Sequence, residues 1–265
     1  MLVLLPPSEG KAEPQRTGRR RVDLSTLAHP ELTEARRAVL DAVVGASARD
    51  DAADRFGVGP AALAEVRRNV DLARLPARPA HEVYTGVLYA ALDHPSLSAD
   101  ARRRAARWVR VQSALWGPIR LGDVIPSYRV SAHTRLPGFG SLPGWWRERT
   151  ASLDLPAGPV VDCRSQGYAD AWRMPAGVET LQVRVVTEVD GRLVSVSHHA
   201  KHTRGLVVRA LLETDRPLRS GRQVVAALGA AGFDCALLGD GPRRRLEVRA
   251  VLGGNEGSDR REAAG

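Results

Sequence analysis

The run of apolar residues at Leu2–Leu5 constrains the fold more than any other feature of the sequence. Four consecutive apolar side chains closed by Pro6 and Pro7 are typical of a short buried strand. Similar short runs recur along the chain, and stretches with apolar residues at helical spacing separate them. This alternation predicts an α/β fold with a mixed sheet and flanking helices.

The remaining elements can be predicted by residue range. Strands are expected at residues 109–116, 160–162, 180–188, 192–197, 235–238 and 245–252, and an Asp190-Gly191 turn joins the third and fourth of these as a hairpin. Helices are expected at residues 31–44, 48–56, 61–69, 81–92, 100–108, 206–213 and 221–231, with Ser98 as the cap of the fifth. Residues 136–147, which include Trp145 and Trp146, are expected to form a loop rich in Gly and Pro.

The chain of 265 residues is expected to form one domain at residues 1–252. Within it, residues 29–108 are expected to be a mainly helical insertion, and residues 253–265 should be a disordered tail. The content of 43% apolar and 26% charged residues is typical of a soluble globular protein. Two cysteines, Cys163 and Cys235, are too few for a disulfide framework. No run is long enough to cross a membrane, and Met1–Leu5 is too short for a signal-peptide core, so we expect a cytoplasmic protein.

Lysine is scarce in this sequence. Only Lys11 and Lys201 are lysines among the 39 basic residues, so arginine serves wherever a plain positive charge suffices. A lysine is required where a compact ammonium, a shiftable pKa or a nucleophilic amine is needed. The net charge of +9 favours a polyanionic or phosphorylated partner, and an arginine-rich coding bias is the alternative explanation for part of it.

The stretch 197–205 is the densest in chemically active side chains. If Lys201 were buried among arginines, its pKa would fall and it could act as a base or an amine nucleophile. The alternative is a phosphate-binding point charge without chemistry. His198, His199 and His202 raise the question of a metal site, but the strand-to-helix junction predicted here breaks the spacing that such a site needs, so we expect no metal and no cofactor.

Polar residues follow the ends of several predicted strands. In open α/β sheets such loops converge on a ligand crevice. Convergence would make a cationic cleft that recognises phosphate or carboxylate, with Asp123 as the one carboxylate to orient or neutralise an arginine. The alternative is that several of these residues form surface ion pairs. The residues concerned are Ser8, Lys11, Arg120, Asp123, Tyr128, Arg129, Ser165, Tyr168, Lys201 and Arg204.

The turn Gly57-Val58-Gly59 joins two of the predicted helices. This pattern is similar to a helix-hairpin-helix element, in which backbone amides at the start of the second helix hold a DNA phosphate. Arg67 and Arg68 lie about one turn later. An ordinary helical connection needs only a C-cap Gly and a Pro in the first turn, so both interpretations are open.

Several spaced motifs in this order resemble the peroxide-stress YaaA family. They are Tyr84-Thr85-Gly86, Gly117–Arg120, Asp123 with Tyr128-Arg129, Ser165 with Tyr168, and Ala200-Lys201 followed by Arg204-Gly205-Leu206. The resemblance runs from Leu2 to about Glu247. It implies one α/β fold with a positively charged cleft and a helix-hairpin-helix element, binding to duplex and branched DNA, and a role in limiting free iron and oxidative damage during peroxide stress.

Two hypotheses follow for the residues of the cleft. In the first, a monomeric DNA-associated stress protein contacts phosphates through the cleft and through Gly57, Gly59, Arg67 and Arg68. In the second, an enzyme acts on a phosphorylated or nucleotide-like small molecule, with Lys201, Tyr168 and Asp123 near the reacting centre. Both hypotheses use one set of ligand-binding residues, namely Ser8, Lys11, Tyr84, Thr85, Arg120, Tyr128, Arg129, Ser165 and Arg204.

Overall fold

A computed structural model describes residues 1–15, 17–189, 192–194 and 197–250. The side chains of residues 188–198 are not described. The Asp190-Gly191 turn and the predicted tail at 253–265 therefore lie outside the described residues. Within the described residues, no helix is both long and apolar enough to cross a membrane.

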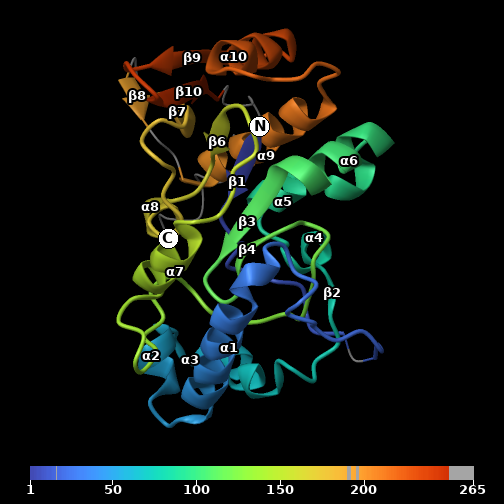
Figure 1. Cartoon of the computed structure of the whole chain (residues 1–265), viewed down its shortest axis with the longest axis vertical. Helices are drawn as coiled ribbons and strands as arrows, with labels where there is room; N and C mark the ends of the chain where they lie inside the picture. Colours follow the sequence, from blue (N-terminus) through green and yellow to red (C-terminus); the bar gives the residue numbers. More distant parts are fainter. Residues whose placement is uncertain (16, 190–191, 195–196, 251–265) are drawn as a thin grey trace, which may run out of the picture.

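One mixed sheet runs from one end of the molecule, at β9 and β10, to its middle, at β3 and β4 (Figure 1), which confirms the predicted fold class. Its strands lie in the order β4-β3-β1-β6-β7-β10-β9, and β8 pairs with β7. β1 is parallel to β3 and β6, and β7 is parallel to β6 and β10, whereas β4, β8 and β9 run antiparallel to their neighbours. The strands are β1 (Leu2–Leu5), β3 (Val109–Ser113), β4 (Gly117–Ile119), β6 (Val160–Asp162), β7 (Thr180–Val189), β8 (Arg192–Val194), β9 (Asp234–Leu238) and β10 (Arg243–Arg249).

The other regular elements are α-helices, short 3-10 helices and a short pairing of β2 (Arg78–Pro79) with β5 (Val124–Ile125). α1, α2 and α3 lie at one end of the long axis, and α10 with β9 and β10 lies at the other (Figure 1). The helices are α1 (Thr33–Ala48), α2 (Ala52–Phe56), α3 (Pro60–Arg68), α4 (Ala80–Val83), α5 (Val87–Leu92), α6 (Ala99–Trp108), α7 (Leu142–Thr150), α8 (Gln166–Ala169), α9 (Ser197–Glu213) and α10 (Gly221–Ala230).

The long helix α9 connects the sheet with the loops at its strand ends. It packs against β7, α10 and, most extensively, α5. The crossing with α5 depends on Gly205, because a Cβ at this position would lie 2.2 Å from the carbonyl oxygen of Leu88 and 2.7 Å from Cβ of Ala91. Gly205, which belongs to a family motif, therefore lets two helices approach closely.

Three of the predicted elements are wrong in extent. The helix predicted at 81–92 is in fact two helices, α4 and α5. The backbone is extended at Tyr84, and Gly86 is the N-cap of the second helix. The loop predicted at 136–147 ends in α7, which Ser141 caps by accepting the amide of Gly144. The junction predicted near Lys201 is also wrong, since α9 begins at Ser197.

Trp146 explains why the segment at 142–150 is helical. Its indole is fully buried, donates to the carbonyl of Ala114 at 2.8 Å and packs on Gly117. Gly117 has a φ of 64° and has no room for a side chain, because a Cβ would lie 2.8 Å from the Trp146 ring. A tertiary contact across 32 residues therefore anchors α7.

Candidate functional site

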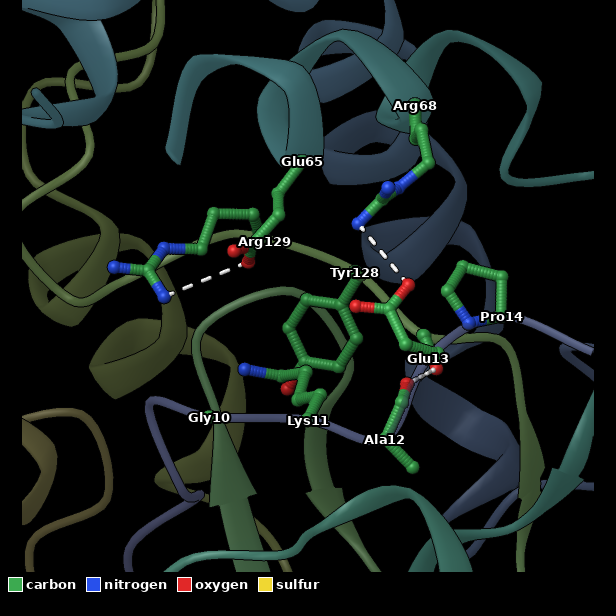
Figure 2. Close-up of a pocket in the computed structure, with 10 residues that line it drawn as sticks. Gly10, Lys11, Ala12, Glu13, Pro14, Glu65, Arg68, Tyr128 and Arg129 are labelled. Atoms are coloured by element: carbon green, nitrogen blue, oxygen red, sulfur yellow. Dashed lines mark hydrogen bonds and ion pairs between the residues drawn. The ribbon is translucent and has the colours of Figure 1, made fainter. Parts of the chain in front are cut away.

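A small pocket lies where the loop after β1 meets α3 and the segment after β5 (Figure 2). Its volume is about 90 Å³, well below the roughly 300–1,000 Å³ of sites for drug-sized ligands. The pocket therefore has room for a small group such as a phosphate or a carboxylate. It is lined by Gly10, Lys11, Ala12, Glu13, Pro14, Glu65, Arg68, Ser127, Tyr128 and Arg129.

Lys11 is held at this pocket by its own loop and by two aromatic rings. Its ammonium donates to the carbonyl oxygens of Ser8 at 2.9 Å and of Glu9 at 3.4 Å. Its Nζ lies 4.4 Å from the ring centroid of Tyr128 and 5.9 Å from that of Tyr84. These are the distances of cation–π contacts, which stabilise the charged form of the amine.

Burial has the opposite effect and lowers the pKa of Lys11 to about 7. The positive charge of Arg129 lowers the pKa further, and the carboxylates of Glu65 and Glu9 raise it in part. Near neutral pH the amine therefore exists in both the charged and the neutral form. A lysine with this pKa can bind an anion when charged and accept a proton or attack an electrophile when neutral.

A chain of hydroxyl groups supports the tyrosines beneath Lys11. Oγ of Ser113 accepts the amides of Leu115 and Trp116 at 3.1 and 3.0 Å, which occupies both of its lone pairs. Its hydrogen is therefore available only for Tyr128, 2.7 Å away, and the hydroxyl groups of Tyr128 and Tyr84 are hydrogen-bonded at 2.9 Å. Burial raises the pKa of both tyrosines, so both remain protonated hydrogen-bond donors.

Arg129 is fixed at the rim of the pocket by α3 and the residue that follows it. The side chain of Asn69 accepts the Arg129 amide at 3.0 Å and donates to the Arg129 carbonyl at 2.9 Å. The guanidinium lies 3.6 Å from the carboxylate of Glu65 and donates to the Glu9 carbonyl at 3.4 Å. Sequence patterns did not indicate Ser113 or Asn69, because their partners lie 15 and 60 residues away.

The loop after β6 brings Tyr168 to the same end of the sheet. Cys163 donates its amide to the Leu4 carbonyl at 2.9 Å, so this loop begins beside the end of β1. Burial raises the pKa of Tyr168 to about 12, an effect increased by Glu9 and opposed by Arg129. Ser165 is exposed at the start of α8 and makes no side-chain cap.

The family motif Tyr84-Thr85-Gly86 is placed against the same loop. The backbones of Lys11 and Tyr84 form an isolated antiparallel bridge. Gly86 touches Ser8, since a Cβ on Gly86 would lie 2.8 Å from the Ser8 Cβ. Thr85 is exposed beside Gly10. Ser8, Lys11, Tyr84, Thr85, Tyr128, Arg129 and Tyr168 are thus brought to one end of the sheet, as expected for loops at strand ends.

Arg120 and Asp123 do not join this group, contrary to expectation. They follow β4, which runs antiparallel to β3, so they lie near the opposite end of β3 from Ser113. The Asp123 carboxylate accepts the backbone amides of Ala28 at 2.8 Å and Arg120 at 2.9 Å. Asp123 therefore joins two loops through their backbones, and Arg120 is exposed.

Lys201 and Arg204 lie on α9 but differ in their surroundings. Lys201 is exposed, so the predicted burial among arginines is not observed. Arg204 donates to the Val183 carbonyl at 3.3 Å, and its charge lowers the pKa of the Cys163 thiol against the larger effect of burial. His198, His199 and His202 share this helix, and within the described residues no three His, Cys, Asp or Glu residues are arranged to hold a metal ion.

The Gly57-Val58-Gly59 turn joins α2 and α3 at an exposed tip. Gly57 is the C-cap of α2 with a φ of 61°, and Pro60 is in the first turn of α3, as both interpretations of the turn require. Arg67 donates to the carbonyls of Ser47 at 3.0 Å and Arg49 at 2.8 Å. Arg68 lies 3.8 Å from the Glu13 carboxylate, so both arginines already contact groups within the protein.

Comparison with known proteins agrees with the resemblance found in the sequence. The sequence profile described as peroxide stress protein YaaA matches residues 1–220. The chain belongs to the YaaA family. It is 44% identical to a UPF0246 protein of Streptomyces coelicolor, with 88% of this chain and 91% of that protein covered. A UPF0246 protein of Corynebacterium efficiens is 36% identical, with 88% and 94% covered. The family name supports the peroxide stress role expected from the sequence.

Proposed function

We propose that this chain acts in the peroxide stress response as a protein that binds the phosphates of DNA and limits iron-driven oxidative damage. Family membership supports the stress role, and the net charge of +9 supports an anionic partner. The position of α3 carries the proposal: its exposed first turn follows the Gly57–Gly59 hairpin, and its last turn forms a wall of the Lys11 pocket.

A DNA backbone lying along α3 would meet anion ligands at both ends of this helix. The first turn offers the positive end of the helix dipole and the amide of Ala61, because Pro60 has no N–H and the Ala62 amide donates to the Gly59 carbonyl at 3.1 Å. The far end lies beside Lys11 and Arg129, which would be the ligands of the proposed cationic cleft. Nine helical residues span about 13 Å, the axial rise of about four phosphates on one DNA strand.

The substitution Ala61→Glu tests this arrangement. Ala61 is exposed in the first turn of α3, where a carboxylate favours the helix but repels a phosphate. Ala106→Glu, at an exposed position of α6, is the matched control. Measured by fluorescence anisotropy with a duplex oligonucleotide, Ala61→Glu is expected to weaken binding about tenfold or more and Ala106→Glu less than about twofold. Equal affinities of the two variants would contradict the proposed role of the hairpin.

An enzyme that acts on a phosphorylated or nucleotide-like small molecule is the second candidate. The observation in its favour is the pKa of about 7 for Lys11 beside a pocket of phosphate size. In this function Lys11 supplies the reactive amine, Arg129 binds the anionic group, and Tyr168 is the nearby hydroxyl. Lys201 is the alternative amine, and its exposure makes it the weaker candidate.

A further inference from the structure

The face of the sheet formed by β7, β10 and β9 opposite α10 is open to solvent. Paired residues of neighbouring strands point to the same side, so the register assigns Gln182 and Arg184 of β7 to the face that carries Arg245 and Glu247 of β10. These residues alternate with the buried Leu181, Val183, Val185, Leu246 and Val248, which face the helices. Gln182, Arg184, Arg243, Arg245, Arg249, Asp234 and Ala236 are exposed on the open face.

An uncovered face is unusual for these strands. β7 and β10 pair in parallel over seven residue pairs, and parallel strands are normally covered on both faces. Here α9 and α10 cover only one. On the same side of the sheet, Val160 and Asp162 of β6 are buried, and so is Val186 of β7, the partner of Arg249. The open area is therefore local to β7, β10 and β9.

The charge of this face is positive. Among the residues whose side chains the structure describes, four arginines stand on it against two acidic residues, Asp234 and Glu247. Arg249 pairs with Asp234 at 3.3 Å, and Arg243 donates to the Met174 carbonyl at 2.9 Å. Among the described residues, neither Arg184 nor Arg245 has an ion pair within 4.0 Å or a side-chain hydrogen bond. Two guanidinium groups are thus available to an external anion.

We infer that this open face, which we call the arginine face, is a second contact surface for the phosphate backbone of duplex DNA. Arg243 and Arg245 are two residues apart on one strand, about 6.6 Å, which matches the rise of about two phosphates on a DNA strand. Arg184 stands on the adjacent strand, about 4.8 Å across. A guanidinium binds a phosphate through two parallel hydrogen bonds. No described side chain on this face is aromatic, so it lacks the stacking groups that single strands require.

This inference rests on the proposed function, because it assigns further contacts to the same DNA. The arginine face belongs to the end of the molecule that carries β9 and β10, and the α2–α3 hairpin lies at the other end (Figure 1). The two surfaces are therefore far apart along the chain's long axis. A duplex that reaches both would bind more tightly than either surface alone allows.

The double variant Arg184→Gln with Arg245→Gln tests the arginine face. Arg107→Gln with Arg222→Gln removes the same charge from exposed helix positions and is the control. Binding to a duplex and to a single strand of equal length is measured by anisotropy against salt. For the duplex, we expect the slope of log affinity against log salt to fall in magnitude by about 1.8 in the test variant and to remain unchanged in the control.

The outcomes separate this inference from the proposed function. If the test variant matches wild type while Ala61→Glu loses affinity, the arginine face is wrong and the DNA-binding proposal stands. If both double variants lose the same slope, the effect is general charge, and the arginine face is again wrong. If wild type binds no duplex at all, the proposed function fails. A larger loss for the single strand than for the duplex would also overturn the assignment to duplex DNA.

Discussion

The two lysines of the chain occupy different environments. The composition singled out both, because arginine cannot supply an amine whose pKa shifts. Lys11 is the one that the fold encloses, between two tyrosine rings and beside Arg129. Lys201 stands exposed at the beginning of α9. The sequence could not distinguish them, since Tyr84 and Tyr128 approach Lys11 only through the fold.

The protonation of Lys11 should control anion binding at the pocket. Its pKa lies near 7, so the site loses positive charge as the pH rises through about 7. Sulfate is a suitable probe because its charge is constant over this range. By isothermal titration calorimetry, we expect the affinity for sulfate to fall several-fold between about pH 6 and pH 8, in line with one lost charge.

Two conservative variants test this prediction. Lys11→Arg keeps its charge over the same range and should remove the pH dependence, and Lys201→Arg should retain it. Sulfate affinity that is independent of pH in wild type, or a pH dependence lost in Lys201→Arg, would contradict the role of Lys11.

The crossing of α5 and α9 links the pocket to the sheet. Gly86, the N-cap of α5, lies against Ser8, and α9 crosses α5 at Gly205, so both glycines are positions of close approach. Arg204, next to Gly205, reaches the Val183 carbonyl of β7. These close contacts bring the loop after β1, α5, α9 and β7 together, so residues that are distant in the sequence lie near one another.

Gly205→Ala should destabilise the fold through this crossing. A methyl group 2.2 Å from the Leu88 carbonyl forces the helices apart, and overpacking of this kind costs about 1–3 kcal/mol or more. Gly45→Ala, in α1 with no atom within 4 Å of the added Cβ, is the control and should stabilise by about 0.5–1 kcal/mol. Urea unfolding measures both, and equal effects would show that the crossing tolerates a side chain.

Local patterns predicted some elements and missed others for identifiable reasons. The strands at Leu2–Leu5 and Val160–Asp162 were predicted because their apolar side chains are suited to burial, and the structure buries them all. The burial of Asp162 was not apparent from the sequence, since it depends on the ion pair with Arg164. α7 was missed because Pro and Gly fall in its first turn and the burial of Trp146 comes from a distant contact. The position of Asp123 was missed because only the antiparallel course of β4 decides it.

At the scale of the whole molecule, the proposed DNA contacts lie at both ends of the long axis. The α2–α3 hairpin and the Lys11 pocket belong to one end, and the arginine face belongs to the other (Figure 1). Acidic residues such as Glu13 and Glu65 reduce the positive charge at the pocket, so its contribution to DNA binding is expected to be smaller than its arginines alone would give. Each of these proposed DNA contacts is a contact with phosphates, and DNA binding by this chain therefore depends on them.

The affinity of the wild-type chain for a duplex as a function of salt tests this dependence most directly. Each neutralised phosphate releases counterions and adds about 0.9 to the slope of log affinity against log salt. With contacts from the hairpin, the pocket and the arginine face, we expect log affinity to fall with log salt with a slope of about −3 or steeper between about 50 and 200 mM salt. An affinity that does not change with salt, or no binding at the lowest salt concentration, would contradict the account.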